Sequence, residues 1–156
     1  MKGNPKVIEL LNEALRDELM AINQYFLHAE MCENWHYHKL SSYIKKQSID
    51  EMKHAEVLIE RILFLDGTPN LTQPMKLVVG NSVKEQLTND LQAEVEAVAK
   101  YNRMSKEARE AGDNATRELF DKLLKDEENH LDWLEAQLHQ IKELGYERYL
   151  SQQIES

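Results

Sequence analysis

The sequence predicts an all-α fold in which four long helices form a bundle with one long crossover connection, followed by a short fifth helix at the C-terminus. Helix breakers are rare, with 5 Gly and 3 Pro among 156 residues. Apolar residues recur at steps of three and four along most of the chain, which is the period of an amphipathic helix. Two predicted turns are short and one connection, 67–82, is long. Two antiparallel helix pairs are therefore expected, joined by a crossover.

The boundaries of the helices follow from a few capping residues and breakers. Asn4 is a typical N-cap and Pro5 is tolerated in a first turn, so the first helix is expected to begin there. Gly67 is expected to end the second helix and Gly145 the fourth. We expect helices over residues 5–35, 39–66, 83–111, 115–144 and 146–154, within a single domain that spans residues 1–156.

Composition narrows the class of function. The net charge of −9 disfavours a nucleic-acid partner, which would need a basic face, and it suits cations instead. Cys32 is the one cysteine, so an internal disulfide is excluded and a thiolate metal cluster is disfavoured. No apolar run is long enough to span a membrane, and the N-terminus MKGNPKVIELL lacks the apolar region of a signal peptide. We therefore expect a cytoplasmic protein.

The two halves of the chain repeat the same pattern at an offset of 76 residues, as from Glu51 to Glu127. In each half, a Glu-x-x-His motif interrupts the apolar stripe of one helix, and a Glu lies 33 residues before it on the stripe of the preceding helix. Because each stripe should face the bundle interior, the core is expected to be polar at one level on all four helices. The stripe residues concerned are Glu18, Glu51, His54, Glu94, Glu127 and His130.

These six side chains predict a dinuclear metal centre. Four buried carboxylates would be costly without matching cations, and the stripes carry no Lys or Arg at this level. Two divalent cations balance four carboxylates, and an oxygen-rich set with one imidazole per metal suits iron or manganese. A third Glu-x-x-His, Glu33 and His36, lacks the preceding Glu and lies near a predicted helix end. We interpret it as solvent-exposed and outside the centre.

The positions of the residues suggest their roles. Glu51 and Glu127 lie beside their histidines and can bridge the two metals, while Glu18 and Glu94 can each bind one metal. His54 and His130 then bind one metal each. Further candidates are Tyr25 and Tyr101, either as hydrogen-bond donors to a ligand carboxylate or as ordinary core tyrosines. Asp50 and Asp126 are expected on the solvent-facing side.

Met52 lies one step off the inward stripe of the second helix, where the repeat places Glu128 in the other half. It belongs to a second apolar line formed by Ile49, Met52, Ile59 and Leu63. A single bundle cannot bury both lines, so a second subunit is expected to cover this one. Met52 can be filler in that interface, or the same Met from two subunits can meet across a two-fold axis and ligate a haem iron.

The stretches MKGNPKVIELLN, AINQYFLHAEM, SIDEMKHAEVLIERILFLDGTPNL and LLKDEENHLDWLEAQL resemble bacterioferritins, over essentially the whole chain. The resemblance implies a ferritin-like four-helix bundle and a hollow 24-mer of two-fold dimers. It implies a ferroxidase centre at the six stripe residues above. It also implies a haem b shared between two subunits and ligated by Met52 of each, with the fifth helix near the four-fold axis.

The sequence departs from the family's pattern at one position. Many bacterioferritins carry a His where this chain has Lys46, and that His forms an inner-surface iron site with the residue equivalent to Asp50. A protonated lysine cannot replace an imidazole ligand. The inner-surface iron site, with Asp50 as its ligand, is therefore left open.

We expect a protein of iron storage and detoxification. The resemblance implies a ferroxidase that oxidises Fe²⁺ to Fe³⁺ with O₂ or H₂O₂, two iron ions per subunit, and a ferric mineral held inside the 24-mer. A ferredoxin-type reductant is a possible partner for iron release through the haem. The alternatives are a small dinuclear oxidase, peroxidase or manganese catalase without storage, and a structural bundle without metal. The first alternative would use the same six ligands.

Overall fold

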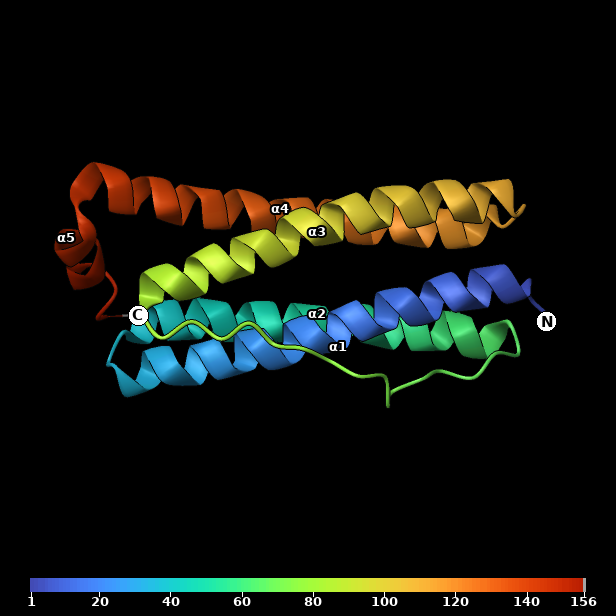
Figure 1. Ribbon diagram of the computed structural model, residues 1–156, viewed down its shortest axis with the longest axis horizontal. Helices are drawn as coiled ribbons and strands as arrows, with labels where there is room; N and C mark the ends of the chain where they lie inside the picture. Colours follow the sequence, from blue (N-terminus) through green and yellow to red (C-terminus); the bar gives the residue numbers. More distant parts are fainter. Residues whose placement is uncertain (156) are drawn as a thin grey trace.

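The computed structural model describes residues 1–155, and this part of the chain forms five helices connected without strands. Figure 1 shows the four long helices running along the bundle, with the short fifth helix folded across one end. The predicted all-α bundle with one crossover and a short C-terminal helix is confirmed. The helices are α1 (Pro5–Asn34), α2 (His38–Phe64), α3 (Val83–Glu110), α4 (Asn114–Leu144) and α5 (Tyr146–Ser151).

Side-chain caps begin three of the long helices. Asn4 accepts a hydrogen bond from the backbone N–H of Lys6 at 2.8 Å at the start of α1. Ser82 caps α3 by accepting from Glu85 N at 3.2 Å, and Asp113 caps α4. Each cap satisfies a backbone donor that the first turn of a helix leaves free.

A residue in the left-handed region follows the C-terminal end of α1, α2 and α3. These residues are His36 (φ 66°), Asp66 (φ 57°) and Gly112 (φ 80°). After α2, Asp66 N donates to Leu63 O at 3.1 Å and Gly67 N donates to Ile62 O at 2.9 Å, which is the Schellman arrangement. This geometry ends α2 at Phe64, two residues before the predicted end.

The crossover, residues 65–82, runs the length of the bundle and returns the chain to the start of α3 (Figure 1). Side chains of α1 hold its backbone in place. Asn12 Oδ1 accepts from Asn70 N at 2.8 Å, Gln24 Oε1 from Val78 N at 3.0 Å, and His28 Nε2 from Gly80 N at 3.0 Å. At Gly80 a Cβ would collide with the backbone of Gln86, so the close approach of the crossover to α3 requires glycine.

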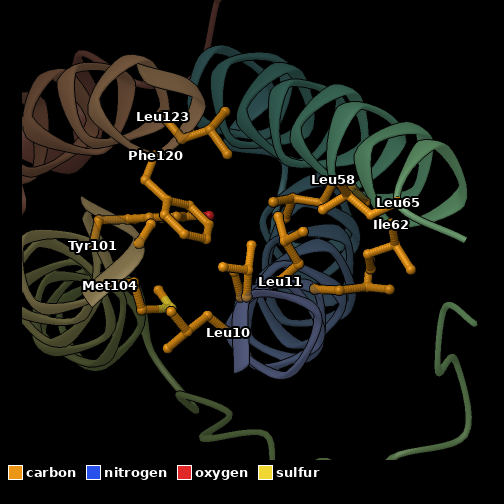
Figure 2. Close-up of a cluster of buried hydrophobic side chains, with 14 residues drawn as sticks. Leu10, Leu11, Leu58, Ile62, Leu65, Tyr101, Met104, Phe120 and Leu123 are labelled. Carbon is orange, nitrogen blue, oxygen red and sulfur yellow. The ribbon is translucent and has the colours of Figure 1, made fainter. Parts of the chain in front are cut away.

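Two apolar clusters fill the bundle, one toward each end. Figure 2 shows the first, in which side chains from all four long helices, among them Leu11, Leu58, Met104 and Phe120, point toward one another. The second cluster includes Tyr25, Ile44, Leu87 and Leu134 on the same four helices. On every long helix the residues predicted to ligate metal lie between these clusters, together with other buried polar side chains such as Gln47 and Asp90. The apolar core is thus divided by a polar layer.

The predicted second apolar line of α2 is largely exposed in the single chain. Ile49, Met52 and Leu63 are exposed, as are Phe26 and Leu27 on α1. Ile59 differs, because it is half-buried against the first apolar cluster. Within residues 1–155, none of the helices combines the length and the apolar character needed to cross a membrane.

Candidate metal centre

The polar layer brings together all six side chains predicted to ligate metal, and none of them is more than 7% exposed. They form two overlapping groups, and within each group the potential ligand atoms lie within 4.8 Å of one another. Glu51 of α2 and Glu127 of α4 belong to both groups. The first group adds Glu18 and His54, and the second adds Glu94 and His130.

Each histidine faces the helix opposite its own. His54 Nδ1, on α2, lies 3.0 Å from Glu127 Oε1 of α4 and 3.4 Å from Glu18 Oε2 of α1. His130 Nδ1, on α4, lies 2.9 Å from Glu51 Oε1 of α2 and 3.6 Å from Glu94 Oε1 of α3. The repeat in the sequence therefore appears in space as two equivalent half-sites, with the imidazole centroids 6.4 Å apart.

The layer contains buried polar atoms without hydrogen-bond partners. These atoms are Glu18 Oε2, Glu51 Oε1, Glu94 Oε2 and His130 Nδ1. His130 Nδ1 and Glu51 Oε1 are only 2.9 Å apart, but they are not aligned for a hydrogen bond, so their short distance does not satisfy either atom. Unpaired oxygens and an unpaired ring nitrogen in a buried layer are the donor set that two divalent cations would satisfy. The residues present fit a dinuclear metal centre.

Tyr25 and Tyr101 donate hydrogen bonds to the two glutamates that belong to one group each. The Tyr101 hydroxyl of α3 donates to Glu18 Oε1 of α1 at 2.5 Å, and the Tyr25 hydroxyl of α1 donates to Glu94 Oε1 of α3. Burial, followed by repulsion from the neighbouring carboxylates, raises the pKa of both phenols well above the usual value, so both remain donors. In each glutamate one oxygen is held by a tyrosine and the other is left free toward the centre.

Asp50 and Asp126 lie on the outer side of the histidines. Asp126 Oδ2 is 3.0 Å from His54 Nε2, and Asp50 Oδ2 is 3.7 Å from His130 Nε2. Both carboxylates are partly exposed, as expected, but the sequence reasoning missed their contacts with the histidines across the bundle. The repeated Asp-Glu-x-x-His pattern was the available signal. An acceptor at Nε2 orients an imidazole so that Nδ1 faces the centre.

Protons compete with cations in the layer. Burial, followed by repulsion from Glu18, raises the pKa of Glu51 to about 8, and burial also raises the pKa of Glu18 and Glu94. Burial alone would lower the pKa of the two histidines, but their carboxylate neighbours raise it overall. Without a metal, the layer therefore retains protons that a cation must displace.

This competition predicts a pH dependence of metal binding. Below pH 8 Glu51 holds a proton that must leave before its carboxylate can ligate. Because the two histidines also hold protons that must leave, we expect the apparent affinity of the metal-free protein for Co²⁺ to fall by about tenfold per pH unit or more as the pH decreases from 8 to 6.5. The measurement is a titration followed by the visible absorption of bound Co²⁺. An affinity that is constant over this range would contradict the prediction.

Comparison with known proteins identifies the family. A model of the ferritin-like domain matches residues 8–144. Bacterioferritin of Brucella melitensis is 47% identical over 149 residues, covering 96% of this chain and 92% of the relative. Bacterioferritins of Streptomyces coelicolor and Mycobacterium leprae are 46% and 44% identical, covering 99% and 97% of this chain and 93% and 96% of the relatives. The chain belongs to the bacterioferritin family.

In this bacterioferritin Met52 lies outside the polar layer. Its side chain is on the exposed side of α2 and is 46% exposed. Lys46, which stands where many bacterioferritins carry a histidine, is also exposed on α2.

Two cavities border the candidate metal centre. One cavity, of about 310 Å³, lies between α2 and α4 and is lined by His54, His130, Asp50, Asp126 and Tyr43, with Lys53 and Asn129. The other lies between α1 and α3 and is narrower, with a volume of about 70 Å³. Cavities therefore border the ligand layer on two sides of the bundle.

Proposed function

We propose that this chain is an iron-storage ferroxidase that oxidises Fe²⁺ to Fe³⁺ and stores the product as a ferric mineral inside a hollow 24-mer, which also removes toxic Fe²⁺. The observation that carries the proposal is the buried layer of four carboxylates and two imidazoles in two overlapping groups, with unpaired atoms in its interior. Membership in the bacterioferritin family supports iron as the metal. We also propose that residues 1–156 act as a single domain in the cytoplasm.

The position of each residue in the two ligand groups suggests which metal ion it would bind. Glu51 and Glu127 would bridge two iron ions, because each belongs to both groups. Glu18 and His54 would bind one ion, and Glu94 and His130 the other. When bound, the two ions would supply one electron each to O₂ or H₂O₂.

The surrounding residues would hold these ligands in place. Tyr25 and Tyr101 would fix one oxygen of Glu94 and Glu18, and thereby direct the other oxygen to the metal. Asp126 would orient His54 in the same way. We assign Asp50 first to His130 and only second to an inner-surface iron, because Lys46 offers no imidazole there.

We further propose that two subunits related by a two-fold axis share one haem b, with Met52 of each as an axial ligand. The support is an exposed thioether within the apolar line of α2, together with exposed apolar side chains on α1, Phe26 and Leu27. A second copy of the chain would cover this surface. A ferredoxin-type protein is the proposed reductant for iron release.

Size-exclusion chromatography combined with iron loading tests the storage function. We expect a particle of about 24 subunits that retains added iron as a ferric mineral after the column. The controls are the same particle in the absence of oxidant and a loading experiment with albumin. A dimer or tetramer that oxidises Fe²⁺ but retains no iron would contradict storage and would favour a small dinuclear oxidase or peroxidase.

A further inference from the structure

The narrow cavity between α1 and α3 ends on the ligand carboxylates. These helices pack against each other (Figure 1), and the cavity between them reaches Glu18, Glu51, Glu94 and Glu127. Four small side chains line it, from Ala14, Ala21, Ala93 and Ala97. Because alanines fill little of the space between the two helices, the cavity stays open as far as the polar layer.

An ion pair lies in this cavity. Lys100 Nζ of α3 is 3.0 Å from Asp17 Oδ2 of α1, and both residues line the cavity. The two side chains are 35% and 20% exposed, so the pair lies nearer the surface than the buried ligands. Among the described residues that line the cavity, Lys100 is the only basic one, whereas Asp17 and the exposed Glu96 are acidic.

The ion pair lies one residue from a candidate metal ligand on α1 and one residue from that ligand's hydrogen-bond donor on α3. Asp17 precedes Glu18, and Lys100 precedes Tyr101, which donates its hydroxyl to Glu18. The contact between α1 and α3 therefore contains two interactions side by side. One is the buried hydrogen bond from Tyr101 to Glu18, and the other is the ion pair between the residues that precede them, Lys100 and Asp17. Neither Asp17 nor Lys100 belongs to the ligand groups, so separating the two side chains would alter the cavity without removing a ligand.

The other half of the repeat lacks this arrangement. At the offset of 76 residues, Ala93 corresponds to Asp17 and Gln24 corresponds to Lys100. Gln24 instead donates to the buried Asp90 at 2.8 Å. The charged pair is thus present only on the side of Glu18, although the two half-sites have the same ligands.

We propose that the Asp17–Lys100 ion pair gates the entry of cations to the metal centre between α1 and α3, a role that rests on the proposed function of that centre. In the paired state the ammonium neutralises Asp17 and repels an incoming divalent cation. A cation passes when it displaces Lys100 from Asp17, and the freed carboxylate then attracts it toward Glu18. The pair is partly exposed to solvent, which weakens it enough to open.

Rapid mixing of the metal-free, assembled protein with Co²⁺ tests the gate through binding rather than turnover. Lys100→Gln is expected to bind Co²⁺ about threefold to tenfold faster at low ionic strength, because it removes the repelling charge. Asp17→Asn is expected to bind it more slowly by a similar factor, because Lys100 then lacks its partner. The amount of Co²⁺ bound at saturation should not change. Arg16 Nη2, which lies 3.5 Å from Asp17 Oδ1, is unchanged in both variants, so its charge does not account for a difference between them.

Lys106→Gln is the matched control, because Lys106 is an exposed lysine of α3 that does not line the cavity. It removes the same charge and should bind Co²⁺ at the wild-type rate. A purely structural ion pair would change the rate in the same direction in Lys100→Gln and Asp17→Asn, or in neither, and either result would overturn the gate. Failure of the wild-type protein to bind Co²⁺ in the polar layer would instead overturn the proposed function.

Discussion

Replacing Glu127 with Gln is expected to slow rapid Fe²⁺ oxidation by about a hundredfold or more, because the carboxylate that belongs to both ligand groups is lost. An amide cannot bridge two cations as a carboxylate does, and its NH₂ group would direct a donor toward them. The measurement is the formation of ferric absorbance after rapid mixing of the assembled protein with Fe²⁺ and O₂. Thermal unfolding of the same sample checks that the bundle is intact.

Glu128→Gln is the control for this experiment. Glu128 is the next residue on α4, it is exposed, and it belongs to neither ligand group. The metal-free Glu127→Gln variant should remain folded, because glutamine has nearly the volume of glutamate and both apolar clusters are unchanged. If oxidation proceeded at the wild-type rate in that stable variant, the layer would be a structural feature and not a metal centre.

Replacing Met52 with Leu is expected to abolish haem binding while the particle remains assembled. Leucine preserves the apolar volume in the exposed line of α2 but offers no sulfur to the haem iron. We expect the ratio of Soret to protein absorbance in the particle peak to fall at least about tenfold, since a haem without axial ligands is held only by packing. Size-exclusion chromatography with both absorbances measures size and haem together.

Met75→Leu provides the matched control, because Met75 is also an exposed methionine but lies in the crossover. It should leave the Soret absorbance unchanged. A particle of Met52→Leu with a full Soret band would show that another residue ligates the haem. A wild-type particle without any Soret band would contradict the haem proposal as a whole.

The fold class and the grouping of the six candidate ligands could be predicted because both depend on periodicity within single helices. Steps of three and four place Glu51 with His54, and Glu127 with His130, on one face of each helix. The 76-residue repeat then aligns the two helix pairs. The residues of the third motif lie apart from one another in function: His36 follows α1 with φ 66°, and Glu33 contacts His38 instead, at 2.8 Å from its Nδ1.

Features that depend on how the helices are placed against each other could not be predicted in the same way. The sequence places Asp126 beside Glu127, but its contact with His54 depends on the relative height of α4 and α2. The pairing of Asp17 with Lys100 likewise requires the register of α1 against α3. The fifth helix was predicted to reach residue 154, whereas the structure ends it at Ser151 with turn hydrogen bonds from Gln152 and Gln153.

The division of the core by the polar layer has a consequence for how the protein can work repeatedly. Each apolar cluster draws on all four long helices, so each holds the bundle together independently of what occupies the layer between them. Ligand carboxylates can therefore gain or lose charge and change partners while the ends of the helices stay fixed. Amide hydrogen exchange should accordingly be slowest in the two apolar clusters and should respond to metal mainly in the segments between them. A scaffold of this kind can be filled and emptied over many cycles without passing through an unfolded state.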